Sequence, residues 1–102
     1  ALELGLEGGY RASAYFTMCG CHQRLGELDK AEVWCKRAIQ IEPQKIIYKL
    51  GLGEVLLMGK KWEEAVKVFK EVVVKDPEEG RALVGVVRGY KGMGDEEGEW
   101  KA

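Results

Sequence analysis

Four side chains able to bind metals lie in the first third of the chain. They are Cys19, Cys21, His22 and Cys35. On a helix, residues two apart point about 200° away from each other, so Cys19 and Cys21 cannot hold the same ion. Cys19 and His22 share a helix face, and Cys35 is able to approach them from a neighbouring helix. Three ligands without an evident fourth do not complete a tetrahedral zinc site.

We therefore expect Cys19 and Cys35 to be small core residues, and we predict neither a bound metal nor a disulfide. The chain has three cysteines, and this odd number argues against a closed disulfide framework. The same cysteine usage predicts a reducing, cytoplasmic location.

Catalytic motifs have little support in this sequence. The single histidine, His22, lies on the apolar face of its predicted helix. Gly51-Leu52-Gly53 is similar to the start of a dinucleotide fingerprint, but no strand precedes it and no third glycine completes it. We expect no enzyme activity, no catalytic residues and no cofactor.

Length and charge limit the remaining classes of function. The chain has 102 residues, which fits one domain, and its formal net charge is −1. This charge balance removes the global electrostatic reason to expect nucleic-acid binding. No apolar run approaches the roughly 20 residues of a membrane helix, so we expect no membrane insertion. Because the chain begins without Met, we expect it to be a fragment of a longer protein or a processed product.

A repeat of 34 residues organises the chain. The repeated positions are Ala31, Cys35 and Pro43, followed by Ala65, Phe69 and Pro77. A repeat of this length predicts stacked helical units, because one unit cannot bury its own apolar face. The apolar spacing predicts helices that start near residues 14, 29, 47, 62 and 79. We expect the first helix to end at Gly26, and the last to break at Gly92-Met93-Gly94.

These motifs resemble the tetratricopeptide repeat family. The first unit reads Tyr15, Met18-Cys19, His22, Ala31, Cys35 and Pro43. The second reads Lys49, Leu52-Gly53, Leu56, Ala65, Phe69 and Pro77. The third reads Leu83, Val86-Val87 and Tyr90, then departs, because Glu99 stands where the family has a small residue.

The resemblance implies an all-α helical-repeat solenoid, in which antiparallel helix pairs stack in a right-handed superhelix. The whole chain, residues 1–102, would be one domain. Residues 12–45 and 46–79 would be complete repeats, and residues 80–102 a partial third repeat. Residues 1–11 would be the tail of a preceding helix or a linker.

In this family the first helix of each repeat lines a concave groove. The resemblance places these groove candidates here: Phe16, Arg24, Ile47, Leu50, Glu54, Leu57, Val84, Arg88 and Lys91. They combine an apolar strip with basic flanks, which suits an apolar and acidic peptide. The alternative interpretation is that neighbouring repeats partly cover Leu57, Met58 and Val84.

The expected function is a non-catalytic protein-interaction module that presents this groove to a peptide or a partner domain. The alternatives are self-association through an uncapped apolar end of the array, for which we expect an oligomer, and a spacer segment. A carboxylate clamp for chaperone tails is not expected, because Phe16, Gly20 and Gly51 occupy the places of its Lys and Asn residues.

Overall fold

Five α-helices form the described part of the chain. The computed structural model describes the backbone of residues 4–97 and the side chains of residues 10–94, and within residues 4–97 it contains no strand. The helices are α1 (Leu4–Arg24), α2 (Leu28–Ile41), α3 (Ile46–Met58), α4 (Trp62–Lys75) and α5 (Gly80–Glu97). The expected all-α class is confirmed. None of these helices has the length and apolar character to cross a membrane.

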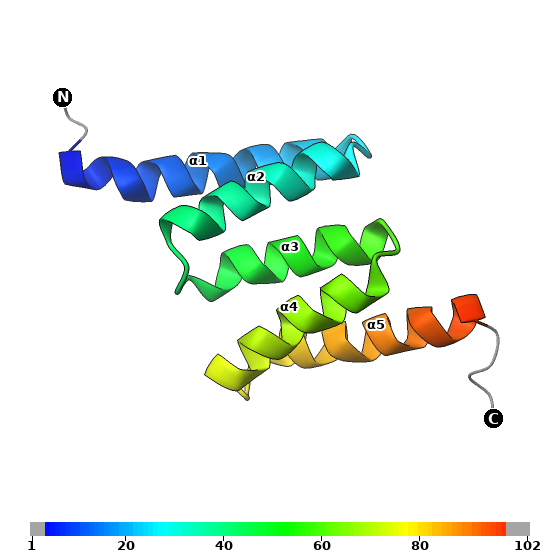
Figure 1. Ribbon diagram of the computed structural model, residues 1–102. Coiled ribbons are helices and arrows are strands. Elements are labelled where there is room, and N and C mark those ends of the chain that lie inside the picture. The colour runs from blue at the N-terminus through cyan, green and yellow to red at the C-terminus, as the bar shows by residue number, and fades with distance from the viewer. Residues whose placement is uncertain (1–3, 98–102) are drawn as a thin grey trace.

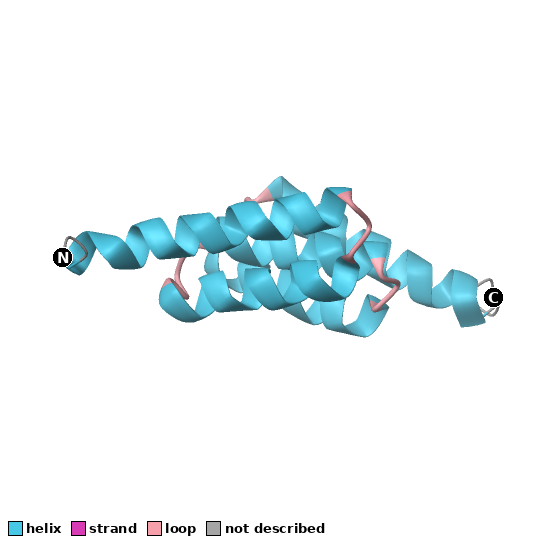
Figure 2. Cartoon of the chain, turned by 90° about the horizontal axis from the view of Figure 1, so that it is seen from above, coloured by secondary structure: helices cyan, strands magenta, loops and turns pink. Residues whose placement is uncertain are grey.

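Each helix packs against the next one along the chain, and α3 also contacts both α1 and α5. Figure 1 shows α3 in the middle, with α1 and α2 on one side and α4 and α5 on the other. The first turns of α1 and the last turns of α5 project in opposite directions beyond the other helices (Figure 2). The layer of odd-numbered helices is therefore continuous from one end of the molecule to the other.

The 34-residue period reappears in the helix boundaries. The second helices of the two pairs begin at Leu28 and Trp62, and α3 and α5 begin at Ile46 and Gly80. Asp29 lies in the first turn of α2, where a negative charge interacts favourably with the helix dipole. Helices α2 and α4 end two residues before Pro43 and Pro77, respectively. The proline ring disfavours helical geometry at the residue that precedes it.

Two expectations about helix ends are wrong. Residues 4–11 belong to α1 itself, and not to a preceding helix or linker; extending an existing helix costs far less than starting one. At the other end, α5 continues through Gly92-Met93-Gly94 to Glu97. Gly92 and Gly94 are buried, and a Cβ atom at Gly92 would meet the ring of Trp62. The close packing of α5 on α4 thus outweighs the low helix propensity of glycine.

The core lies between the two helix layers. Its main cluster includes Cys19, Ala31, Leu56, Ala65 and Phe69, each at most 2% exposed. The ring of Phe69 lies where side chains at Gly53 on α3 and Gly85 on α5 would otherwise be. Small residues at these crossings therefore let three helices close around one aromatic ring.

An ion-pair network joins α2 to the residue that precedes α4. Glu32 on α2 lies 2.8 Å from the ammonium groups of both Lys36 and Lys61. Burial alone would raise the pKa of Glu32, but the hydrogen bonds and the positive charges of the two lysines together lower the pKa by more. A carboxylate with a lowered folded-state pKa stabilises the fold above its unfolded pKa, and this contribution is lost as the pH falls through the folded value.

The turns before α2 and α4 use the same left-handed backbone conformation. Gly26 has a φ angle of 81°, and Lys60, which is 34 residues later, has a φ angle of 62°. A side chain in this conformation costs about 1 kcal/mol, whereas glycine adopts it freely. We expect Lys60→Gly to raise the free energy of unfolding by about 0.5–1 kcal/mol.

Urea denaturation measures this change, with Gly26→Ala as the reciprocal variant. We expect Gly26→Ala to lower the free energy of unfolding by about 1 kcal/mol. A Lys60→Gly protein that is less stable than the parent would show that this turn does not require a left-handed residue.

Candidate functional site

An open pocket lies between the end of α3 and the middle of α5. Its volume is about 400 Å³, and it is lined by Leu57, Met58, Trp62, Arg88, Lys91 and Gly92. Three of the nine groove candidates, Leu57, Arg88 and Lys91, therefore lie around one cavity. Pockets of roughly 300–1,000 Å³ with apolar walls and a few polar groups are the usual form of ligand sites.

Glycine on α5 brings the indole of Trp62 into the pocket wall. Trp62 is the first residue of α4, and its ring lies against Gly92, where a Cβ atom would overlap it. Its Nε1 atom is buried and has no hydrogen-bond partner within the described residues. An indole N–H left without an acceptor costs about 1–3 kcal/mol, so the packing around this ring stabilises the fold by enough to offset that cost.

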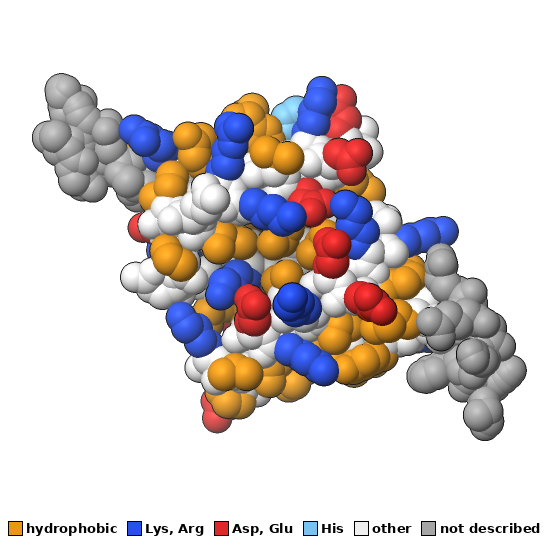
Figure 3. Space-filling model, in the orientation of Figure 1, with side chains coloured by type: hydrophobic (Ala, Val, Ile, Leu, Met, Phe, Trp, Pro, Cys, Tyr) orange, Lys and Arg blue, Asp and Glu red, His pale blue; other side chains and the backbone are white. Residues whose placement is uncertain are grey.

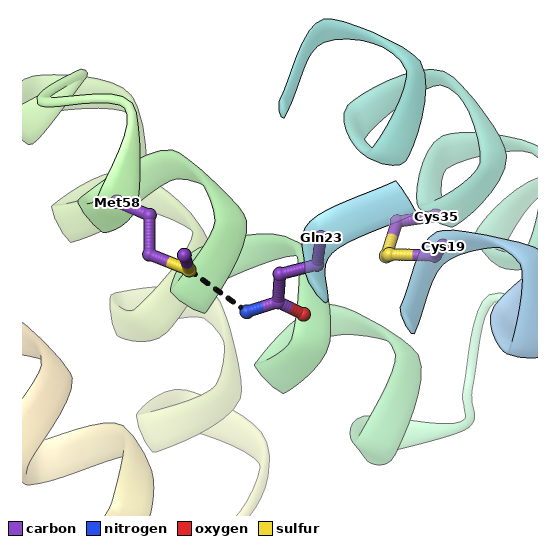
Figure 4. Close-up of a disulfide and its surroundings, with 4 residues drawn as sticks. All are labelled: Cys19, Gln23, Cys35 and Met58. Carbon is purple, nitrogen blue, oxygen red and sulfur yellow. Dashed lines mark hydrogen bonds between the residues drawn. A yellow bond between two sulfur atoms is a disulfide. The ribbon is translucent and has the colours of Figure 1, made fainter. Parts of the chain in front are cut away.

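Helix α1 reaches the edge of the same pocket. Gln23 donates a hydrogen bond from Nε2 to the sulfur of Met58 at 3.0 Å (Figure 4). Met58 remains 52% exposed, while Leu57 is half-buried beside it. The exposed side chain of Met58 therefore forms the edge of the pocket, and a methionine side chain adapts easily to apolar ligands.

Arg88 and Lys91 supply the positive charge of the pocket. They are three residues apart on α5 and so lie next to each other on the helix surface. Both are exposed, and neither forms an ion pair within the part of the chain that the structure describes. Among the side chains of residues 10–94, no acidic one lines the cavity, so within this part of the chain the charge of the lining comes from these two cations.

The remaining groove candidates lie outside this pocket. Phe16 is half-buried, with its ring centroid 5.1 Å from that of Tyr48. Exposed side chains are found at Arg24, Ile47, Glu54 and Val84. They lie on α1, α3 and α5, the three helices that form one continuous layer.

The assignment of Leu50 to an accessible groove is wrong. Leu50 is only 5% exposed and belongs to the main core cluster. It lies on α3, which is covered by α1 on one side and α5 on the other. The equivalent positions on α1 and α5, Phe16 and Val84, have an odd-numbered neighbour on one side only and remain more accessible.

Neither Trp62 nor Gly92 was among the groove candidates predicted from the sequence. A signal for both exists in the spacing of Gly85, Gly89 and Gly92, which lie four and three residues apart. This spacing puts the three glycines on one face of a helix and predicts a close helix approach there. In the structure the approaching side chains are Phe69, Val66 and Trp62, respectively.

The prediction that the chain has no disulfide is wrong. Cys19 on α1 and Cys35 on α2 form a disulfide (Figure 4), with their Cα atoms 5.5 Å apart. Cys21 is a free, exposed cysteine. An odd cysteine count shows only that one thiol is left over. The close crossing of α1 and α2, which requires small residues at both positions, also brings the two sulfur atoms together. Because disulfides persist in oxidising compartments, the cysteines no longer argue for a cytoplasmic location.

Reduction of this disulfide is expected to destabilise the protein. The two cysteines are 16 residues apart, and closing a loop of that size contributes about 3 kcal/mol. Thermal unfolding with and without dithiothreitol measures the effect. The control is the Cys19→Ala/Cys35→Ala variant, whose melting temperature should not respond to the reductant. Three free thiols per chain after unfolding without reductant would contradict the disulfide.

The other side chains considered for chemistry do not converge on a metal site. Among the described residues, no three His, Cys, Asp or Glu side chains gather in a metal-binding group. His22 is partly buried at the end of α1, with its Nδ1 atom 2.7 Å from the carboxylate of Glu27. This hydrogen bond lowers the pKa of Glu27. The pair joins the end of α1 to the turn before α2.

A second pocket, of about 300 Å³, lies beside α2 and α4. It is lined by Lys36, Ile39, Gln40, Lys49, Leu52, Val68 and Glu71. Figure 3 shows this side of the molecule, where positive and negative side chains alternate around apolar patches. Lys49 lies 3.6 Å from Glu71, and Lys36 pairs with Glu32, so the cations of this pocket are already neutralised.

The chain was compared with protein-family models and with curated proteins. No protein-family model matches the chain, and no curated protein matches it.

Proposed function

We propose that the chain is a non-catalytic, peptide-binding module of the tetratricopeptide type. In this proposal α1–α2 and α3–α4 are successive repeats of a solenoid, and α5 is the first helix of a third. The repetition of helix starts and of the left-handed turn at an interval of 34 residues supports this assignment. The surface formed by α1, α3 and α5 would hold the partner. In the reducing cytosol, the module would act with Cys19 and Cys35 as free thiols.

The observation that carries the proposal is the open pocket between α3 and α5. The two proposed first helices, α3 and α5, supply five of its six lining residues, namely Leu57, Met58, Arg88, Lys91 and Gly92. A peptide lying across α3 and α5 would contact both helices at once. Apolar surface with a charged rim is the usual composition of a peptide-recognition groove.

Selection of peptides from a random display library tests this function. We expect selected peptides to bind the folded chain, and Met58→Glu and Val84→Glu to weaken that binding at least about tenfold by placing a carboxylate on the apolar part of the proposed surface. Both residues are 52% exposed, so the variants should stay folded.

The matched controls carry the same substitution on α2 and α4. Val33→Glu and Val74→Glu replace residues that are 48% and 82% exposed, and we expect both to keep peptide binding. Loss of binding in the controls alone would place the site on the α2–α4 side and overturn the proposal.

Self-association through α5 is a second candidate function. Leu83, Val87 and Tyr90 are 45%, 64% and 43% exposed and lie on one face of the last helix. The residue 34 positions before Val87, Gly53, is buried at the crossing with α4, and Cys19 is buried in the same way at the crossing with α2. The corresponding faces of α1 and α3 are covered by α2 and α4, whereas this face of α5 is exposed.

Sedimentation at several concentrations tests this second candidate. We expect reversible association of the unmodified chain and a monomer for Val87→Asp, because a carboxylate on the open face would have to be buried in the contact. A chain that stays monomeric at all concentrations would exclude self-association and leave peptide binding unaffected.

A further inference from the structure

The cations that line the pocket between α3 and α5 differ from those at several other places on the surface. Elsewhere, Lys36, Lys49, Lys61 and Arg81 each lie beside a glutamate. Other basic side chains lie over aromatic rings, as Lys70 does at 5.3 Å from the Tyr90 ring centroid. Arg88 and Lys91 have neither kind of partner within the described residues, and yet both line a cavity.

The two pockets described above show the same contrast. The pocket beside α2 and α4 has two lysines and one glutamate in its lining, and both lysines are paired with a carboxylate. The pocket between α3 and α5 is lined by one arginine, one lysine and, as far as the described side chains extend, no acid. An unpaired cation pair beside apolar walls favours a ligand that brings its own negative charge.

The apolar part of the pocket sets the second requirement. Leu57, Met58 and the indole of Trp62 provide its walls, and the indole packs directly against Gly92 on α5. A cavity of about 400 Å³ is large enough for one amino-acid side chain together with an adjacent polar group. Met58 is held at the edge by Gln23 but is still 52% exposed.

We propose that this pocket recognises an acidic–aromatic pair inside a peptide. The aromatic side chain lies against Leu57, Met58 and Trp62, and the neighbouring carboxylate accepts hydrogen bonds from Arg88 and Lys91. The arginine can bind the carboxylate through two N–H groups, and the lysine adds a point charge. This inference rests on the proposed peptide-binding function and specifies the ligand of the same site.

The choice of an internal carboxylate follows from the position of the cations. Arg88 and Lys91 are adjacent on one helix and face an open cavity lined also from α3 and α4. A peptide is therefore able to continue past the site in both directions. The test peptides carry blocked ends, so that a side-chain carboxylate is the only one available at the site.

Four fluorescent heptapeptides with acetylated and amidated ends form the probe set. Their central residues are Asp-Phe, Asn-Phe, Asp-Ala and Asn-Ala, in an otherwise identical sequence of Gly and Ser. We expect fluorescence anisotropy to show the tightest binding for Asp-Phe, with losses of about fivefold to tenfold for Asn-Phe and for Asp-Ala. Raising the salt concentration should weaken the binding of the Asp-Phe peptide and leave the binding of the Asn-Phe peptide nearly unchanged.

Arg88→Gln/Lys91→Gln connects these losses to the pocket. In this variant we expect Asp-Phe and Asn-Phe to bind equally, because the groups that distinguish a carboxylate from an amide are gone. Lys67→Gln/Lys75→Gln is the control: both lysines are exposed on α4, and the net charge changes by the same amount. The control should keep the preference for Asp-Phe.

Several outcomes would overturn the inference. They are equal binding of Asp-Phe and Asn-Phe to the unmodified chain, a preference that survives in the Arg88→Gln/Lys91→Gln variant, and no binding of Asp-Phe at any accessible concentration. Peptides from the random library separate this failure from failure of the proposed function. If they bind at Met58 and Val84 but lack an acidic–aromatic pair, the binding module stands and only its ligand chemistry is wrong.

Discussion

The Ala31→Arg variant is expected to be largely unfolded at room temperature. Ala31 is fully buried in the core cluster that also holds Cys19 and Cys35. An arginine there needs space that the helix crossing does not have, and it would bury a charge without a partner. We expect a loss of at least about 3 kcal/mol, which is a large fraction of the stability of a small domain.

Circular dichroism during thermal unfolding measures this loss. Lys30→Arg, at the exposed neighbouring position on α2, is the matched control and should leave the melting temperature almost unchanged. An Ala31→Arg protein as stable as this control would show that α1 and α2 do not cross closely at Ala31.

Leu50→Glu is expected to be comparably destabilising. Its leucine is 5% exposed between α1 and α5, so a glutamate at that position loses its hydration and finds no cation within the main apolar cluster. Burial of an unpaired carboxylate and loss of leucine packing together should cost about 3–5 kcal/mol. A protonated glutamate would reduce this cost, so the variant should recover part of its stability as the pH is lowered.

Ile47→Glu provides the comparison on the same helix. Ile47 is 44% exposed. We expect the free energy of unfolding of Ile47→Glu, measured by urea denaturation, to lie within about 0.5 kcal/mol of the parent value. A similarly small effect of Leu50→Glu would return this residue to the accessible surface and restore the original groove assignment.

The helices were predictable from the sequence because their signals are local and repeated. Pro43, Pro77 and the alanines at Ala31 and Ala65 mark the same positions in two successive helix pairs. The ends were less predictable. Gly92 would weaken an isolated helix, and only its contact with Trp62 explains why α5 continues past it.

The site was only partly predictable, because a repeat pattern specifies the face of a residue but not its accessibility. Leu50 and Leu57 both belong to the face assigned to the groove, yet one is buried in the core and the other lines the pocket. The difference depends on how closely α1 and α5 approach α3. The disulfide required the same three-dimensional information, since the cysteine count did not specify which pair would meet.

Nuclear magnetic resonance mapping of a bound peptide tests the central claim most directly. The backbone amide signals of the ¹⁵N-labelled chain would be followed during titration with the Asp-Phe heptapeptide or with a peptide selected from the library. We predict that the largest shifts occur at Leu57, Met58, Arg88, Lys91 and Gly92, which surround the pocket between α3 and α5. Shifts centred on Ile39, Leu52 and Val68, in the pocket beside α2 and α4, would contradict the account.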